Sequence, residues 1–193
     1  MSLETVDPPI AAYEAVRSRL VNLATTSGFG TPAMRRAPPD ALALSTPHRV
    51  AVLPANRIQP KMALRQAASL KGWRFLILNG KNVIATADTI SNEKGEQRFA
   101  QINEGPFVQG TEQVIRRAEE DELIRKGRFE PVFLMVPTLM VVALWLRDLD
   151  GDADRLMVIP PAPKELRSFA PLATNDFVAV LNDLAKRDAA AKE

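Results

Sequence analysis

The chain has 193 residues, of which 46% are hydrophobic and 25% are charged, a balance that is typical of folded proteins and excludes a disordered chain. It contains no cysteine, which excludes disulfides, thiolate chemistry and every zinc site built on cysteine, and which fits a reducing compartment such as the cytoplasm. The formal net charge is only +2, so the protein as a whole is not strongly basic.

The sequence gives no sign of a membrane segment or a secretory signal. Its most apolar stretch, residues 132–146, is interrupted by Pro137 and is shorter than the roughly 20 residues that a spanning helix needs. The first ten residues have neither the basic region nor the apolar region of a secretory signal. We therefore expect a cytoplasmic protein without membrane association, in which residues 132–146 belong to the core.

The N-terminal part predicts a helical arm followed by a proline-rich linker. Asp7 can cap a helix with Pro8 at its first position, and apolar residues then recur at helical spacing until Gly28. Residues 31–47 contain four prolines, which is typical of an irregular connection. We expect a single domain over residues 1–193, in which residues 1–47 form an arm on a core that begins near His48.

The central part predicts an antiparallel meander. A short strand is expected at residues 48–53 and a helix from Pro60 through Leu70. Residues 73–89 read as a hairpin, in which Asn79-Gly80 forms a type I′ turn between two strands. A further strand over residues 97–103 follows a second polar turn.

The C-terminal part alternates helix and strand signals. A helix over residues 110–126 is favoured by acidic residues four positions before basic ones. Strands are expected at residues 132–136, 139–147 and 156–159, although the short apolar run 139–147 also fits a helix. The last helix is expected to start at Thr174 or Asn175 and to run to about Arg187. Together these elements predict an α+β fold, with an antiparallel sheet (the meander around Asn79-Gly80 plus the C-terminal strands) flanked by about four helices.

The candidate metal site is a turn that carries four carboxylates, those of Asp148, Asp150, Asp152 and Asp154. Over these few residues the turn resembles the calcium loops of EF-hands and of integrin-type β-propeller repeats, which implies a hard cation held by oxygen ligands. If Asp148 is taken as the first position of an EF-hand loop, however, Ala153 stands at position 6, where that loop has glycine. Ile159 stands at position 12, where the loop has the glutamate that completes the calcium site. The alternative is a solvated hairpin turn, because turn geometry alone favours Asp and Gly.

A basic span is the least ordinary feature of the sequence. Nine cationic side chains lie between Arg35 and Lys81, and the only acid in that span is Asp40. If residues 60–70 are helical, Lys61 and Arg65 are one turn apart and share a face. The candidate binding residues are Arg57, Lys61, Arg65 and Lys71.

Three functional hypotheses follow. The first is a non-enzymatic protein that docks another protein through this basic face, since clustered charge steers association. The second is a carboxylate-based or metal-dependent enzyme, or a calcium-binding protein, that uses the turn at residues 148–154. A weaker third is phosphate or nucleic-acid binding by residues 35–81, where Trp73 and Phe75 are more typical of core than of base stacking. No cofactor motif is present, so we expect none.

Overall fold

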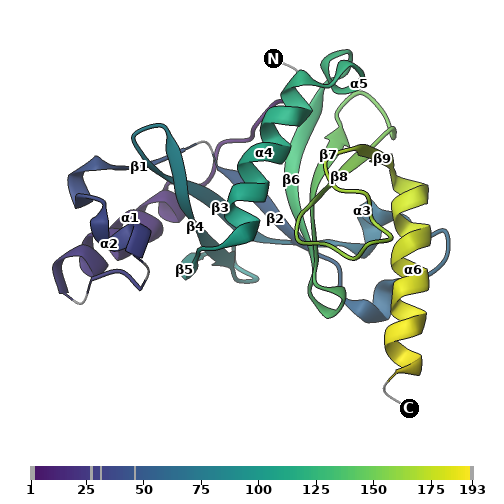
Figure 1. The fold of residues 1–193 in the computed structure, drawn as a ribbon, viewed down its shortest axis with the longest axis horizontal. Helices are drawn as coiled ribbons and strands as arrows, with labels where there is room; N and C mark the ends of the chain where they lie inside the picture. Colours follow the sequence, from purple (N-terminus) through teal and green to yellow (C-terminus); the bar gives the residue numbers. More distant parts are fainter. Residues whose placement is uncertain (1–2, 27, 31, 46, 192–193) are drawn as a thin grey trace. The chain divides into compact units, whose positions relative to one another are not determined.

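The computed structural model describes residues 3–26, 28–30, 32–45 and 47–191 (Figure 1). These residues form six α-helices and nine strands, which are mostly antiparallel with one parallel pair. The α+β class is therefore confirmed, whereas the expectation of about four helices is wrong. The two additional helices, Pro32–Arg36 and Glu122–Arg125, have only five and four residues, too few for their apolar periodicity to be recognised.

The chain divides into two compact units, which are described separately. Unit 1 comprises Met1–Glu4, Val50–Leu70 and Gly110–Glu193, and unit 2 comprises Thr5–Arg49 and Lys71–Gln109. The single domain over residues 1–193, with residues 1–47 as an arm, stays a prediction. No helix among the described residues is long and apolar enough to cross a membrane.

Unit 1 is built on an antiparallel sheet. Its strands, in spatial order, are β6 (Phe129–Val136), β7 (Val141–Asp148), β8 (Arg155–Ile159) and β9 (Pro171–Ala173). Strand β2 (His48–Val52) borders β6. Nearly every residue of β6, β7 and β8 is buried, which explains why these segments are continuous apolar runs.

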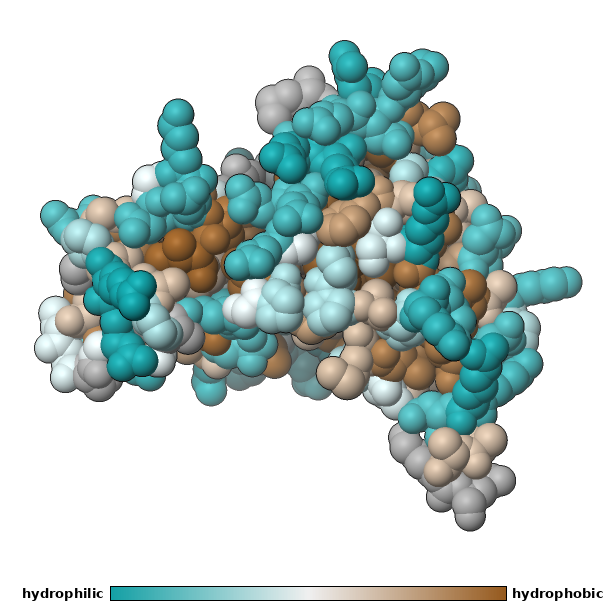
Figure 2. Space-filling view, in the orientation of Figure 1, coloured by the Kyte–Doolittle hydropathy of each residue, from teal (hydrophilic) through white to brown (hydrophobic). Residues whose placement is uncertain are grey.

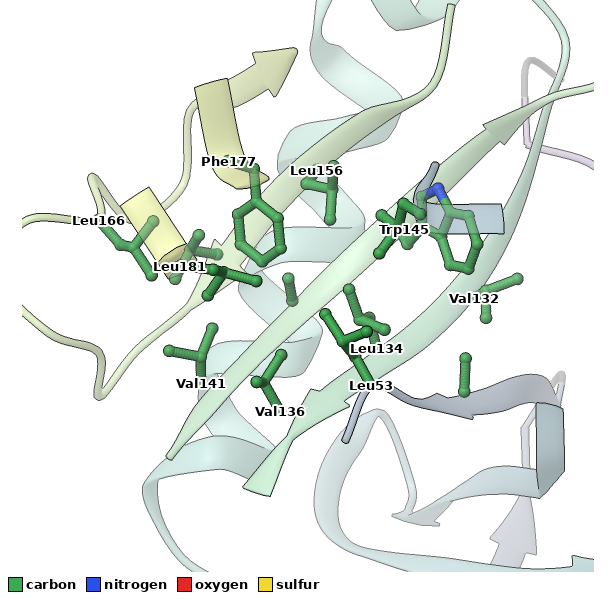
Figure 3. Packing of buried hydrophobic residues seen from close by; sticks show 14 of the residues in the cluster. Leu53, Val132, Leu134, Val136, Val141, Trp145, Leu156, Leu166, Phe177 and Leu181 are labelled. Atoms are coloured by element: carbon green, nitrogen blue, oxygen red, sulfur yellow. The ribbon is translucent and has the colours of Figure 1, made fainter. Parts of the chain in front are cut away.

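The helices α6 (Thr174–Ala190) and α3 (Leu64–Ala67) supply apolar side chains to the core of unit 1. Phe177 and Leu181 of α6 lie fully buried among the strand residues, as Figure 3 shows. Leu64 of α3 belongs to the same cluster. The apolar face predicted for the last helix is therefore confirmed.

The predicted helix over residues 110–126 is two helices, α4 (Pro106–Glu120) and α5 (Glu122–Arg125). Asp121 interrupts the helix because its backbone is extended and its carboxylate accepts hydrogen bonds from the N–H groups of Leu123 and Ile124. The surface over α4 is hydrophilic in Figure 2, which agrees with its exposed charged residues.

In unit 2 the predicted meander is confirmed: β3 (Ser69–Asn79), β4 (Asn82–Ser91) and β5 (Gln97–Asn103) pair antiparallel. The turn between β3 and β4, however, lies one residue later in the chain than predicted. Asn79 pairs with Asn82, so the two central residues are Gly80 and Lys81, and Gly80 has φ +61°. Glycine at the first central position is what a type II′ turn requires, so the predicted type I′ turn at Asn79-Gly80 is wrong.

Helix α1 (Ile10–Thr26) packs Ala12, Val16 and Leu20 into the core of unit 2. The stretch expected to be irregular between residues 31 and 47 contains α2 (Pro32–Arg36), a 3₁₀ turn (Pro39–Ala41) and strand β1 (Leu42–Leu44), which pairs with the end of β3. Thr31, where that stretch was predicted to start, lies outside the described residues. Leu42 and Leu44 pack on the core. Their contacts with the core stabilise a strand in a stretch whose prolines predicted irregular structure.

The helix predicted from Pro60 through Leu70 is reduced to α3, because β3 already begins at Ser69. Lys61 precedes α3 and has a left-handed backbone, with φ +56°. Lys61 and Arg65 therefore do not share a helix face, which corrects the geometry on which the basic face was predicted.

Candidate functional site

The acidic turn joins β7 to β8, as a hairpin connection was expected to do. Asp148 organises it, because its carboxylate accepts hydrogen bonds from the backbone N–H groups of Asp150 and Ala153, each at 3.0 Å. Such Asx bonding holds a loop closed without any ligand.

A cation does enter this turn, and it is the guanidinium of Arg65. Its Nε and Nη2 donate to the two carboxylate oxygens of Asp154. Nη2 also donates to the carbonyl oxygens of Asp148 at 2.7 Å and Gly151 at 3.0 Å. The planar fork of arginine suits this bidentate arrangement. Two predicted sites, one basic and one acidic, are thus brought together by one ion pair.

Asp154 is the centre of this arrangement, with a side chain only 4% exposed. Besides Arg65 it accepts hydrogen bonds from the indole Nε1 of Trp145 at 2.9 Å and from the Asp148 N–H at 2.8 Å. Burial alone would raise the pKa of Asp154, but the hydrogen bonds from Arg65, Asp148 and Trp145 outweigh it and hold that pKa below its usual value.

The other carboxylates of the turn have separate surroundings. Asp150 pairs with Arg128 at 3.0 Å, and Arg128 also forms a bidentate pair with Glu4. Asp152 is 97% exposed and lies 3.5 Å from the Nη1 of Arg65. Within residues 3–26, 28–30, 32–45 and 47–191, no group of three or more Asp, Glu or His side chains is arranged to hold a metal ion.

Metal binding by Asp148, Asp150, Asp152 and Asp154 stays a prediction, and thermal melting tests it. We expect 5 mM Ca²⁺ or Mg²⁺ to change the melting temperature no more than an equal ionic strength of NaCl, because both oxygens of Asp154 already bind Arg65. A ligand specific to the native state raises stability by mass action. A calcium-dependent rise that is lost in Asp150→Asn/Asp152→Asn would establish the metal site instead.

The four candidate binding residues are divided between the two units, and their joint role as a binding surface stays a prediction. Arg57, Lys61 and Arg65 belong to unit 1, whereas Lys71 belongs to unit 2. The Nη1 of Arg57 donates to the carbonyl oxygen of Ala67 at 3.3 Å, and Arg65 is taken up by Asp154. Lys61 is exposed and forms no ion pair among the described residues.

Lys61 borders a groove of about 480 Å³. One wall is Pro60 and Lys61, and the other is a face of α6 that carries Asn175, Ala179, Asn182 and Asp183. These α6 residues recur at helical spacing and lie opposite the buried stripe of Phe177 and Leu181. The groove therefore offers one ammonium group, two amide groups and one carboxylate to a ligand.

A buried polar network in unit 2 was not predicted from the sequence. Arg74 on β3 and Asp88 on β4 are register partners and form a bidentate ion pair, with distances of 2.7 and 2.8 Å. Asp88 also accepts from Asn103 at 2.9 Å and from Gln101 at 3.3 Å. The pairing register of the hairpin could have predicted this ion pair, because it places Arg74 and Asp88 directly opposite each other on two strands.

The nearby aromatic residues are core, as expected. Phe75 is fully buried, and Trp73 is 8% exposed with the guanidinium of Arg49 over its ring at 5.8 Å. Neither ring offers a free face on which a nucleic-acid base could stack.

A second groove, also missed from the sequence, lies within unit 2. It has a volume of about 580 Å³ and runs between helix α1 and strand β1. Tyr13, Arg17, Leu20 and Val21 of α1 line one side, and Asp40 with Leu42–Leu44 line the other. Its sequence signal is the short apolar run of residues 41–44 between Asp40 and Ser45.

Comparison of the chain with family models, with curated proteins and with solved structures finds no match in any of the three.

Proposed function

We propose that this protein is a non-enzymatic interaction protein of the cytoplasm, which docks another protein in the groove between Lys61 and α6, with an acidic group of that partner at Lys61. The observation that carries the proposal is the exposed ammonium of Lys61 beside the polar stripe of α6. A charge of this kind at the rim of a groove steers a partner of opposite charge and fixes its orientation.

Arg65 has a supporting part in this proposal. Its bonds to Asp154 tie α3 to the turn between β7 and β8, which holds the Lys61 segment next to the sheet. Because the carboxylate of Asp154 is occupied by this structural ion pair, the geometry favours docking over carboxylate-based catalysis at the turn.

The test is a charge reversal that leaves the fold intact. Lys61→Glu keeps a long side chain at the left-handed position and should leave the melting temperature unchanged, because exposed substitutions usually cost less than about 0.5 kcal/mol. In affinity purification from a lysate of the source cells, read by mass spectrometry, we expect Lys61→Glu to lose a stoichiometric partner that the wild type retains.

The matched control is Lys126→Glu, which reverses an exposed lysine of the same unit away from the groove. It should retain the partner. Equal recovery with Lys61→Glu and wild type would refute docking at this groove. A partner that disappears after nuclease treatment would instead favour the nucleic-acid alternative.

A further inference from the structure

We infer that the groove between α1 and β1 in unit 2 binds an extended peptide segment of a partner protein, which adds as a further strand to the outer edge of β1. This site is distinct from the Lys61 groove, and the inference does not depend on it.

The first argument is the backbone of β1. Among the strands of the described residues it pairs with β3 alone, along one edge, in the register Leu42↔Asn79, Ala43↔Leu78 and Leu44↔Ile77. The N–H of Ser45 donates to the carbonyl oxygen of Leu76, and antiparallel pairing alternates, so Ala43 also points toward β3. The N–H and C=O groups of Leu42 and Leu44 therefore lie on the outer edge.

An outer edge of this kind is a template for another strand. Many proteins cover such edges or place charged side chains on them, but β1 carries only leucine and alanine. All three of its residues line the groove, so a peptide that lies in the groove can reach the two N–H and two C=O groups of the edge.

The second argument is the opposite wall. Tyr13 is 41% exposed and Val21 is 56% exposed on α1, although both are large apolar side chains. They form, with the buried Leu20, an apolar wall to the groove. In strand addition, backbone bonds supply affinity, and pockets for alternate side chains supply specificity. This wall is suited to an apolar side chain of the peptide.

The third argument is charge. Arg17 and Asp40 line the same groove from opposite walls, and neither forms an ion pair within the described part of the chain. Opposite charges that face a groove without pairing complement a ligand that carries both signs. The expected partner segment is therefore extended, with an apolar centre, an acidic residue that meets Arg17 and a basic residue that meets Asp40.

The experiment begins with selection of random ten-residue peptides, displayed on phage, against the immobilised full chain. We expect enriched peptides to combine an apolar centre with one acidic and one basic residue. The affinity of a synthetic enriched peptide, measured by calorimetry, should fall about tenfold or more in Arg17→Glu. Arg19→Glu, on another face of the same helix, should change it less than about twofold.

Hydrogen exchange read by NMR separates strand addition from other modes. The amides of Leu42 and Leu44 should exchange rapidly in the free protein and become protected when the peptide binds. Absence of any enriched peptide, equal affinity for wild type and Arg17→Glu, or no added protection at Leu42 and Leu44 would each overturn the inference. Protection of these amides that depends on protein concentration without peptide would show a second copy on the edge, and would overturn it too.

Discussion

Replacement of Asp154 by alanine is expected to lower the free energy of unfolding by about 2–3 kcal/mol, because the Arg65 guanidinium loses both of its carboxylate hydrogen bonds and keeps only those to the carbonyl oxygens of Asp148 and Gly151. The indole N–H of Trp145 and the N–H of Asp148 lose their acceptor in the same variant. The indole N–H of Trp145 adds a desolvation penalty, because this side chain is buried and has lost its acceptor.

The measurement is urea unfolding followed by fluorescence. The chain has only two tryptophans, Trp145 in unit 1 and Trp73 in unit 2, so a Trp73→Phe background reports on unit 1 alone. The matched control is Asp152→Ala, whose side chain is 97% exposed and should cost less than about 0.5 kcal/mol. A loss below about 1 kcal/mol for Asp154→Ala would show that the ion pair does not hold the turn.

The same ion pair predicts a dependence on pH. The pKa of Asp154 is lower in the folded protein than in the unfolded chain. The carboxylate therefore makes its full contribution to the free energy of unfolding above the unfolded pKa of about 4. That stability is lost as the pH falls through the folded pKa. Between about pH 5 and pH 3 the wild type should therefore lose more stability than Asp154→Asn, which has no carboxylate to protonate.

The sequence was sufficient to predict the helices and strands whose pattern of apolar and turn residues lies within the element itself. The hairpin around Gly80 and the last helix with Phe177 and Leu181 were both predicted, since alternation, turn residues and helical spacing lie within a few positions. The same reasoning failed for α3, because competition from strand β3 limits that helix to Leu64–Ala67.

The candidate sites show the limit of local reasoning more sharply. The four aspartates of the turn and the cation Arg65 were both identified, but as two unrelated sites. Arg65 and Asp154 are 89 positions apart, and no periodicity or spacing reports a contact of that length. Their meeting in one ion pair depends on how β7, β8 and α3 pack together.

The groove between α1 and β1 escaped prediction for a different reason. Its walls come from a helix that reads as amphipathic and from three residues, Leu42–Leu44, inside a proline-rich stretch. The exposure of Tyr13 and Val21 is a property of packing, and the spacing of apolar residues along α1 does not show which of them the core leaves uncovered.

The ion pair between Arg74 and Asp88 leads to the second large expected effect. Asp88→Ala should lower the stability of unit 2 by about 3–5 kcal/mol, because the guanidinium of Arg74 is buried and loses both of its hydrogen bonds to the carboxylate. Arg74→Met should cost a similar amount, since Asp88 then keeps only the amide bonds from Gln101 and Asn103.

The double variant Arg74→Met/Asp88→Ala should recover about 2 kcal/mol relative to the sum of the two single losses, because neither charge is left buried alone. Gln101 is exposed and Asn103 half-buried, so water can replace the bonds that these amides lose. Urea unfolding in a Trp145→Phe background, with the fluorescence of Trp73 as the reporter, measures the four free energies of unfolding that this double-mutant cycle compares. If the losses add without coupling, the two side chains act independently, and the strand pairing of β3 and β4 rather than the ion pair holds this part of unit 2.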